Sequence, residues 1–302
     1  MKKLSNALPN PLTLKLKQQI KLNALGKIKS QRNITNLVRS LTEISLHRLP
    51  PRRTWGHAID LLPNAPDVLN CKTYQISDGY KQALEEFIKE QLKKGYICHS
   101  KSPYASPLFF VKKKNGKPRP VQDYSVVNTY TIRNTYSLLL IKELINKLVR
   151  KQWFTKFDIR WGYNNVRIKG DKWKAAFKCN KELFEPTVMF FGLTNSPATF
   201  QTMMDSIFRE EITSEDIVIY MDDILIATSG SLDDHCQKVT HVLKKLQDND
   251  LYLKLGKCQF HKDKVEYLGV IVEKEQVKMD PIKVKGITDW PTQPMSPNYG
   301  HS

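Results

Sequence analysis

The chain of 302 residues carries 48 Lys and Arg against 30 Asp and Glu, a formal net charge of +18, and 40% of its residues are hydrophobic. This hydrophobic share excludes a disordered chain, and the positive charge indicates a polyanionic partner. Five cysteines without a CxxC pair indicate a reducing compartment and no structural zinc site, and no apolar run approaches the roughly 18 residues that span a bilayer.

The positive charge is concentrated at the N-terminus. Residues 1–55 contain twelve Lys or Arg and a single acid, Glu43. We predict a basic N-terminal extension over residues 1–55. Either it holds nucleic acid phosphates or it is a poorly ordered leader, and the composition alone favours neither.

Hydrophobic periodicity and turn residues predict the remaining elements in chain order. These are a helix over 77–95, a hairpin of 107–114 and 118–124 around Asn115-Gly116, a helix over 141–149, a strand over 153–159, a helix from Ser196 with Pro197 at its first position, a β-rich run over 217–228, a helix through 239–246, and strands near 251–255 and 265–272. Strands and helices do not alternate strictly, so we expect an α+β fold.

Three acids interrupt strongly apolar strands. Asp222 and Asp223 lie inside the run 217–226, and Asp158 is the one acid of the strand 153–159. Period-two alternation puts Asp158 on the opposite face from Phe157, away from the stripe that we expect in the core. The alternative for Asp222 and Asp223 is that they make the turn of a β-hairpin.

Three carboxylates brought together raise one another's pKa, and a divalent cation relieves the repulsion. Oxygen ligands without His or Cys suit Mg²⁺ or Mn²⁺, and a pair of ions about 4 Å apart is the arrangement of polymerases and nucleases. The cations of the hairpin over 112–119 would suit a triphosphate, although such a run is more often a solvated hairpin tip.

The segment Tyr220-Met-Asp-Asp223 resembles the YxDD box of reverse transcriptases, particularly those of gypsy-type long-terminal-repeat retrotransposons. Further segments resemble the successive blocks of that family in the same order. They begin at Ser102 (SPYASPL), Lys117 (KPRPVQDY), Phe154 (FTKFDIRWGY), Phe191 (FGLTNSPATFQ) and Val265 (VEYLG). The resemblance covers roughly residues 50 to 290.

This resemblance implies an α+β right-hand polymerase fold, with fingers and palm over 56–288, a short tail over 289–302, a truncated thumb and no RNase H domain. It implies that Asp158, Asp222 and Asp223 are the catalytic metal ligands. The implied nucleotide-binding residues are Lys113, Arg119, Tyr163, Phe191, Gly192, Gln201, Tyr220, Met221 and Lys257. Tyr267, Leu268 and Gly269 match the hairpin that grips the primer.

Two of these residues have specific implied roles. Tyr163 matches the aromatic residue that closes against a ribose 2′-hydroxyl and so selects deoxynucleotides. Lys257 matches a lysine that protonates pyrophosphate, and an ordinary surface lysine is an equally good interpretation.

The function implied is an RNA-directed DNA polymerase with two Mg²⁺ ions, or Mn²⁺ in their place. Its partners would be an RNA template, a DNA or RNA primer and dNTPs, in the cytoplasm within a particle or in the nucleus; a mitochondrial location is less favoured. Two alternatives stay open from the residues: a fragment that only binds RNA or an RNA–DNA hybrid, and a carboxylate-metal nuclease.

Overall fold

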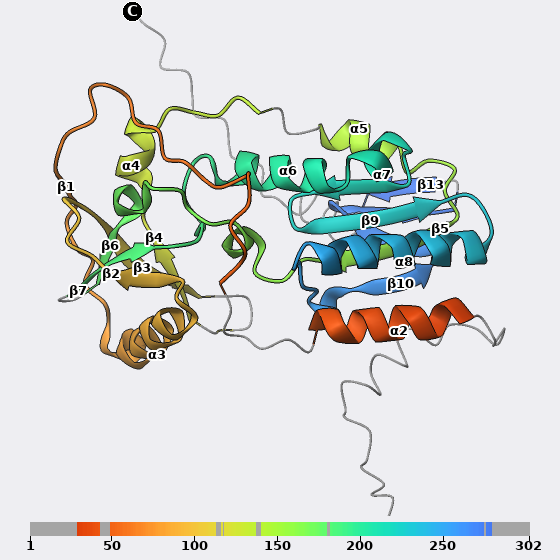
Figure 1. The fold of residues 1–302 in the computed structure, drawn as a ribbon, viewed down its shortest axis with the longest axis horizontal. Helices are drawn as coiled ribbons and strands as arrows, with labels where there is room; N and C mark the ends of the chain where they lie inside the picture. Colours follow the sequence, from red (N-terminus) through yellow and green to blue (C-terminus); the bar gives the residue numbers. More distant parts are fainter. Residues whose placement is uncertain are drawn as a thin grey trace, which may run out of the picture.

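Three β-sheets organise the fold of the chain. The computed structural model describes residues 29–42, 49–112, 116, 118–136, 140–179, 182–274 and 276–279. Figure 1 shows two lobes side by side, which we call the α3 lobe and the α8 lobe after their longest helices. Within the described residues, no helix combines the length and hydropathy needed to cross a membrane.

The α3 lobe is built on a six-stranded sheet of order β1-β3-β6-β7-β2, with β4 paired to β3. Its elements are β1 (Leu69–Asn70), α3 (Asp78–Lys94), β2 (Ile97–His99), β3 (Tyr104–Lys112), β4 (Pro118–Gln122), α4 (Ser125–Tyr130), the 3₁₀ helix η2 (Lys172–Ala175), β6 (Phe177–Cys179) and β7 (Glu182–Pro186). The predicted helix over 77–95 is confirmed as α3. It ends at Gly95, whose φ of 68° is a left-handed conformation that glycine adopts without strain.

The α8 lobe is built on a four-stranded sheet of order β10-β5-β9-β8 and a three-stranded sheet of order β11-β12-β13. Its elements are α2 (Lys29–Thr42), α5 (Ile141–Asn146), β5 (Trp153–Asp158), η1 (Gly162–Asn165), α6 (Ser196–Ile207), α7 (Arg209–Thr213), β8 (Ile217–Tyr220), β9 (Asp223–Thr228), α8 (Leu232–Asp248), η3 (Leu255–Lys257), β10 (Gln259–Lys262), β11 (Lys264–Tyr267), β12 (Val270–Glu273) and β13 (Gln276–Met279).

The four-stranded sheet is buried on both faces. Phe157 belongs to the main core together with residues of α2, α6 and α8, whereas Phe154 belongs to a second cluster with Tyr267 and Val272 of the three-stranded sheet. The period-two prediction therefore placed Phe157 in the core correctly. The opposite face, which carries Asp158, is also covered by packed side chains along most of the strand, and this the sequence analysis did not anticipate.

Residues 29–42 of the predicted N-terminal extension form a packed helix, whereas the described residues 49–55 are not helical. Ile34, Val38 and Leu41 of α2 are fully or almost fully buried in the main core, and the Leu253 N–H donates to the Leu41 carbonyl at 3.2 Å. Figure 1 shows α2 running beside α8. Residues 29–42 are thus part of the α8 lobe, where we had expected a separate extension. Residues 1–28, 43–48 and the predicted tail lie outside the described residues.

Two predicted strands differ in the structure. The segment near 251–255 makes only a single bridge, between Leu253 and Ile159, before it enters η3. The predicted strand over 265–272 is a hairpin of β11 and β12, because Leu268 and Gly269 have φ values of 50° and 83° and turn the chain. Period-two hydrophobicity continues through such a turn, so the pattern alone does not reveal it.

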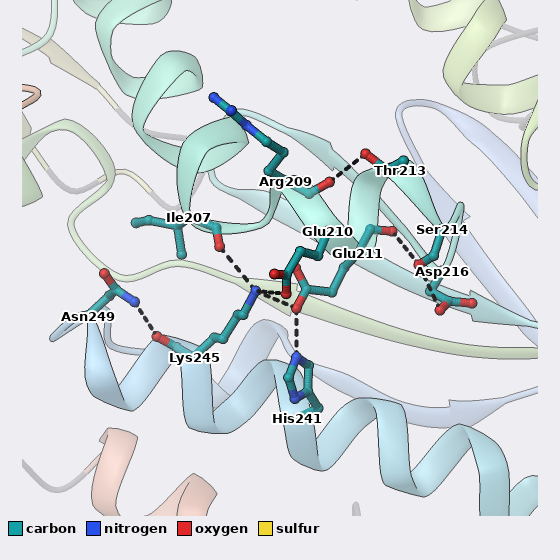
Figure 2. Close-up of polar contacts among 10 residues, drawn as sticks. All are labelled: Ile207, Arg209, Glu210, Glu211, Thr213, Ser214, Asp216, His241, Lys245 and Asn249. Atoms are coloured by element: carbon teal, nitrogen blue, oxygen red, sulfur yellow. Dashed lines mark hydrogen bonds and ion pairs between the residues drawn. The ribbon is translucent and has the colours of Figure 1, made fainter.

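A buried carboxylate joins α7 to α8. The Glu211 side chain is 9% exposed, and one of its oxygens accepts hydrogen bonds from His241 Nε2 and Lys245 Nζ, each at 2.7 Å (Figure 2). Burial acts to raise the pKa of Glu211, but the hydrogen bonds from Lys245 and His241 outweigh it and hold that pKa below its ordinary value. The Lys245 ammonium and the His241 ring therefore keep the Glu211 carboxylate stable in the interface of the two helices.

We expect Lys245→Met to lower the free energy of unfolding by about 1 to 3 kcal/mol, because it leaves the Glu211 carboxylate buried without its ammonium partner. Urea unfolding at pH 7.5 measures the change. Arg209→Ala is the matched control: Arg209 is exposed, its side chain points away from Glu211 in Figure 2, and its loss should stay within about 0.5 kcal/mol. Equal losses in the two variants would contradict the assignment.

A second buried network crosses the α8 lobe. The two ring nitrogens of His235 lie 2.8 Å from Thr155 Oγ1 and 2.9 Å from Thr228 Oγ1, and the imidazole is completely buried. Burial, with the nearby His261 adding to it, lowers the pKa of His235 to about 3. The folded protein therefore holds His235 neutral at pH values where the unfolded chain, with a pKa near 6.5, is already protonated.

His235 should accordingly make the fold sensitive to acid. Above pH 6.5 the residue is neutral in both states and contributes nothing to pH dependence; as the pH falls below 6.5 only the unfolded state takes up the proton, so stability declines until the folded pKa near 3 is passed. By pH 5 the decline from this residue is about 2 kcal/mol. Urea unfolding at pH 7.5 and 5.0 should show a decline smaller by that amount in His235→Gln, and an unchanged decline would refute the assignment.

Candidate active site

Strand pairing brings the three predicted acids to one end of the four-stranded sheet. Asp158, the last residue of β5, is the direct register partner of Asp223, the first residue of the antiparallel strand β9. Directly opposed residues point to the same face, with Cβ atoms about 4.5 to 5.5 Å apart. Asp222 lies in the turn before β9, and its carbonyl accepts a hydrogen bond from the Ile159 N–H at 2.8 Å.

The turn that carries Asp222 is held by a hydrogen bond to the buried side chain of Gln201. Met221 has a φ of 57°, and its N–H donates to Gln201 Oε1 at 2.9 Å. Gln201 is buried on α6, and its amide nitrogen donates to Asp205 at 2.8 Å. Met221 and Asp222 thus form the β8–β9 hairpin turn between the paired residues Tyr220 and Asp223, so the hairpin-turn interpretation holds for Asp222 and not for Asp223. Gln201 positions this turn from the interior.

Two lysines neutralise the acids in this structure. Lys257 Nζ, from η3, donates to Asp158 Oδ2 at 2.8 Å, and Lys156 Nζ lies 3.4 Å from Asp223 Oδ1. The hydrogen bond to Asp158 raises the pKa of Lys257, and the nearby acids raise it further. Asp222 forms no ion pair with a lysine or arginine of the described residues: burial raises its pKa, a backbone hydrogen bond opposes this, and Asp223 and Asp158 raise it again.

The donor chemistry of the acids suits a divalent cation. All three are carboxylates on one edge of the sheet, and the pKa of Asp222 is raised by its burial and, to a smaller extent, by the charges of Asp223 and Asp158. Within the described ranges, however, no three His, Cys, Asp or Glu side chains converge closely enough to hold an ion. In this structure one oxygen of Asp158 pairs with Lys257, and one oxygen of Asp223 pairs with Lys156.

Asp158 and Asp222, but not Asp223, line a cleft of about 870 Å³. Five of the predicted site residues line it: Asp158, Asp222, Arg119, Phe191 and Lys257. Sequence reasoning missed several other lining residues, among them Arg39 and Thr42 of α2, Arg160 and Trp161 after β5, and Lys254 before η3. The apolar spacing of Ile34, Val38 and Leu41 was the available signal that α2 packs on the fold.

An aromatic and cationic wall faces the acids. The Arg119 guanidinium of β4 lies 4.6 Å from the centre of the Phe191 ring, and the ring centres of Tyr163 and Phe191 lie 4.7 Å apart. Burial raises the pKa of Tyr163 to about 12, with Asp222 contributing. These contacts join Arg119, Phe191 and Tyr163 into one surface next to Asp222. Lys113, predicted to act with Arg119, lies outside the described residues.

Gly192 is required by its surroundings. Its φ is 103°, its carbonyl accepts a hydrogen bond from Asn128 at 2.7 Å, and a Cβ at this position would lie 3.1 Å from the Gln122 carbonyl oxygen. The residue therefore holds the loop after Phe191 against β4 in a conformation that side chains disfavour.

The predicted primer-grip residues divide into two kinds. Tyr267 is completely buried, and its hydroxyl lies 3.2 Å from the Val218 carbonyl and 3.3 Å from the Asp223 carbonyl. Tyr267 therefore packs against the β8–β9 hairpin that carries Asp222 and Asp223. Leu268 and Gly269 form the half-buried turn between β11 and β12. Of the three, Leu268 and Gly269 are therefore the ones at the surface.

Replacing Gly192 should test whether the loop after Phe191 needs a glycine at this position. We expect Gly192→Ala to lower the free energy of unfolding by about 1 to 3 kcal/mol, because the left-handed φ and the close Gln122 carbonyl both oppose a Cβ. Gly79→Ala is the control: Gly79 lies in α3 with no atom within 4 Å of an added Cβ, so alanine should be neutral or stabilise by up to about 1 kcal/mol. Thermal unfolding that ranks the variants the other way would contradict the model of the loop.

Comparison with known proteins places this geometry in a family. A family model described as reverse transcriptase (RNA-dependent DNA polymerase) matches residues 111–272, more than half of the chain. The Transposon Tf2-3 polyprotein of Schizosaccharomyces pombe is 40% identical over 202 residues, which are 67% of this chain and 15% of that protein. The Retrovirus-related Pol polyprotein from transposon 297 of Drosophila melanogaster is 34% identical over 266 residues, 86% of this chain and 25% of that protein.

Solved structures share the fold. Foamy viral protease–reverse transcriptase in complex with dsDNA superimposes with a TM-score of 0.81 at 22% identity, over 96% of this chain and 60% of the other. The same kind of protein in complex with an RNA/DNA hybrid gives a TM-score of 0.79 at 21% identity, over 97% of this chain and 39% of the other. The predicted right-hand polymerase fold is thereby confirmed. The chain spans about a seventh to a quarter of the length of the transposon polyproteins it matches, and it belongs to the reverse transcriptase family.

Proposed function

We propose that the chain is the RNA-directed DNA polymerase domain of a gypsy-type long-terminal-repeat retrotransposon polyprotein. It would add dNTPs to a primer 3′-hydroxyl under the direction of an RNA template. The observation that carries this proposal is the register pairing of Asp158 with Asp223, with Asp222 in the adjoining turn, at the wall of an open cleft. In this reading the α3 lobe forms the fingers and the α8 lobe forms the palm.

Asp158, Asp222 and Asp223 are the residues that would hold two Mg²⁺ ions, or Mn²⁺ in their place. When bound, such ions make the attacking hydroxyl a better nucleophile and stabilise the charge on the leaving pyrophosphate. The chain's own contribution is to hold three carboxylates in fixed positions. The pairing of β5 with β9 places two of them, and the Gln201 amide holds the turn that places the third.

The wall opposite the acids would bind the nucleotide. Arg119 offers a guanidinium for the triphosphate, and its contact with the Phe191 ring orients that group without neutralising it. Tyr163, whose ring contacts Phe191 and whose pKa Asp222 helps to raise, would close against a sugar 2′-hydroxyl and so give a preference for deoxynucleotides. Lys257 would release Asp158 and become available to protonate the pyrophosphate that leaves.

The polymer substrates are proposed from charge and from relatives. The net charge of +18 favours a polyanion, and the foamy viral enzymes of the same fold were solved with dsDNA and with an RNA/DNA hybrid. An RNA template with a DNA or RNA primer follows for this chain. The gypsy-type assignment rests on the ordered motif blocks around Tyr220-Met-Asp-Asp223.

Primer extension on an RNA template with a DNA primer, dNTPs and Mg²⁺ tests the proposal. We expect extension by the chain and a loss of at least about 100-fold in Asp222→Asn, because the substitution keeps the shape of the side chain and removes its charge. Asp263→Asn is the matched control, since Asp263 is an exposed acid between β10 and β11 and should leave extension unchanged.

Two other outcomes of this assay would favour the alternative functions, a nuclease or a fragment that only binds nucleic acid. Template cleavage without extension, abolished by the same substitution, would identify a metal-dependent nuclease. Salt-sensitive binding of an RNA–DNA hybrid with neither extension nor cleavage would identify a fragment that only binds nucleic acid. Either result would overturn the polymerase proposal.

A further inference from the structure

The Gln201 side-chain amide can hold the turn that carries Asp222 in only one of its two orientations. Its oxygen accepts a hydrogen bond from the Met221 N–H at 2.9 Å. A glutamine amide turned end for end has nearly the same shape, so its hydrogen-bond partners decide which end faces the turn. The reversed amide would set its own N–H groups against the Met221 N–H, and the turn would lose this support.

Asp205 supplies the partner that decides this orientation. It lies one turn after Gln201 on α6, and its Oδ1 accepts a hydrogen bond from Gln201 Nε2 at 2.8 Å. The same nitrogen lies 3.4 Å from the Ile219 carbonyl, a longer and weaker contact. Gln201 is only 2% exposed, so the amide depends on these protein acceptors. In the reversed orientation its oxygen would face the Asp205 carboxylate, which has no proton to donate.

Asp205 is held in turn by Tyr136, from the segment that follows α4. The Tyr136 hydroxyl donates a hydrogen bond to Asp205 Oδ2 at 2.5 Å. Burial, together with the hydrogen bond to Asp205 and the charge of that acid, raises the pKa of Tyr136 to about 12. The phenol therefore stays protonated at neutral pH and remains a donor to the carboxylate.

The segment that carries Tyr136 is fixed to the beginning of α6. Asn195, the residue before the helix, donates to the Ile132 carbonyl at 2.8 Å and accepts from the Asn134 N–H at 2.9 Å. The Asn134 side chain accepts from the Tyr136 N–H at 2.9 Å. This segment leaves the α3 lobe after α4, whereas α6 belongs to the α8 lobe (Figure 1). Hydrogen bonds at two levels of α6 thus place the Tyr136 hydroxyl on Asp205.

A simpler account is that Asp205 forms an ordinary side-chain pair with the glutamine four residues before it, which stabilises a helix slightly. Helix α8 has such a pair, in which Gln237 Nε2 lies 3.4 Å from Asp233 Oδ2 and both residues are exposed. The pair on α6 differs because Gln201 is buried and the other end of its amide is bonded to the turn.

We propose that Asp205 and Tyr136 are positioning residues for the turn that carries Asp222. Asp205 fixes the Gln201 amide with its oxygen toward Met221, and Tyr136 fixes the carboxylate of Asp205. Both act through Gln201. The inference rests on the proposed function in one respect, namely that Asp222 takes part in the polymerase reaction.

Hydrogen exchange at the Met221 amide tests the inference without any enzymatic activity. The chain has seven methionines, so selective nitrogen-15 methionine labelling gives a simple spectrum, and the Met221 signal is the one absent in Met221→Leu. We expect Asp205→Leu to speed Met221 exchange by about 5- to 10-fold, because the released amide no longer holds that N–H. Asp205→Asn keeps an acceptor oxygen and should retain more of the protection than Asp205→Leu.

A second variant tests the part assigned to Tyr136. Tyr136→Phe removes only the hydroxyl and should speed Met221 exchange by about 2- to 3-fold, since the Asp205 carboxylate loses one of its two partners. An unchanged rate in Tyr136→Phe overturns the role of Tyr136. An unchanged rate in Asp205→Leu overturns the whole inference.

Controls in the same spectrum separate positioning from helix stability. Met203 and Met204 lie on α6 between Gln201 and Asp205 and report whether the helix itself has loosened. If Asp205→Leu speeds exchange equally at these residues and at Met221, Asp205 holds the helix and the inference is overturned. Asp233→Leu removes the exposed pair on α8 and should leave Met221 exchange unchanged.

Primer extension then connects the turn to the reaction. We expect Asp205→Leu to lower kcat by about 5- to 20-fold and to change KM for the dNTP by less than about 3-fold, because a displaced Asp222 affects bond formation more than binding. Faster Met221 exchange with an unchanged kcat overturns the positioning role. If the unaltered chain extends no primer while Met221 exchange responds as expected, only the polymerase proposal fails.

Discussion

The antiparallel pairing of β5 with β9 forces the carboxylates of Asp158 and Asp223 onto the same face at the same end of a sheet, and the turn adds Asp222 beside them. Like charges at this spacing repel, and the charges of Asp223 and Asp158 add to burial, the larger cause, in raising the pKa of Asp222. Such an arrangement persists only if the surrounding structure is stable without it. Much of the α8 lobe supplies that stability.

That support comes from both sides of the four-stranded sheet. On one face the main core packs α2, α6 and α8 against the sheet, and α6 also supplies Gln201 to hold the turn at Met221. On the other face the three-stranded sheet supplies Tyr267, whose hydroxyl meets the Asp223 carbonyl. The acids are thus held by rigid elements, which is the condition for electrostatic catalysis without rearrangement at the moment of reaction.

Much of this arrangement follows from local sequence signals. Ser77 and Gly95 delimit α3, and the alternation in 153–159 places Phe157 in the core. What sequence did not reveal depends on contacts between distant segments. The charge of residues 1–55 obscured the apolar spacing of α2, so Arg39 was not connected to the cleft. Nor does any local pattern show that Tyr267, inside a family motif, is a buried support and that Lys257 pairs with Asp158.

The Lys257–Asp158 ion pair has a consequence for the order in which the protein is assembled. An ammonium from the same chain already balances the most buried of the three acids, so the charge of Asp158 has its partner within the fold itself. Folding around the acids then needs no metal ion as a template, unlike in small zinc domains that fold only around their metal. A chelator should accordingly leave the fold of the chain intact.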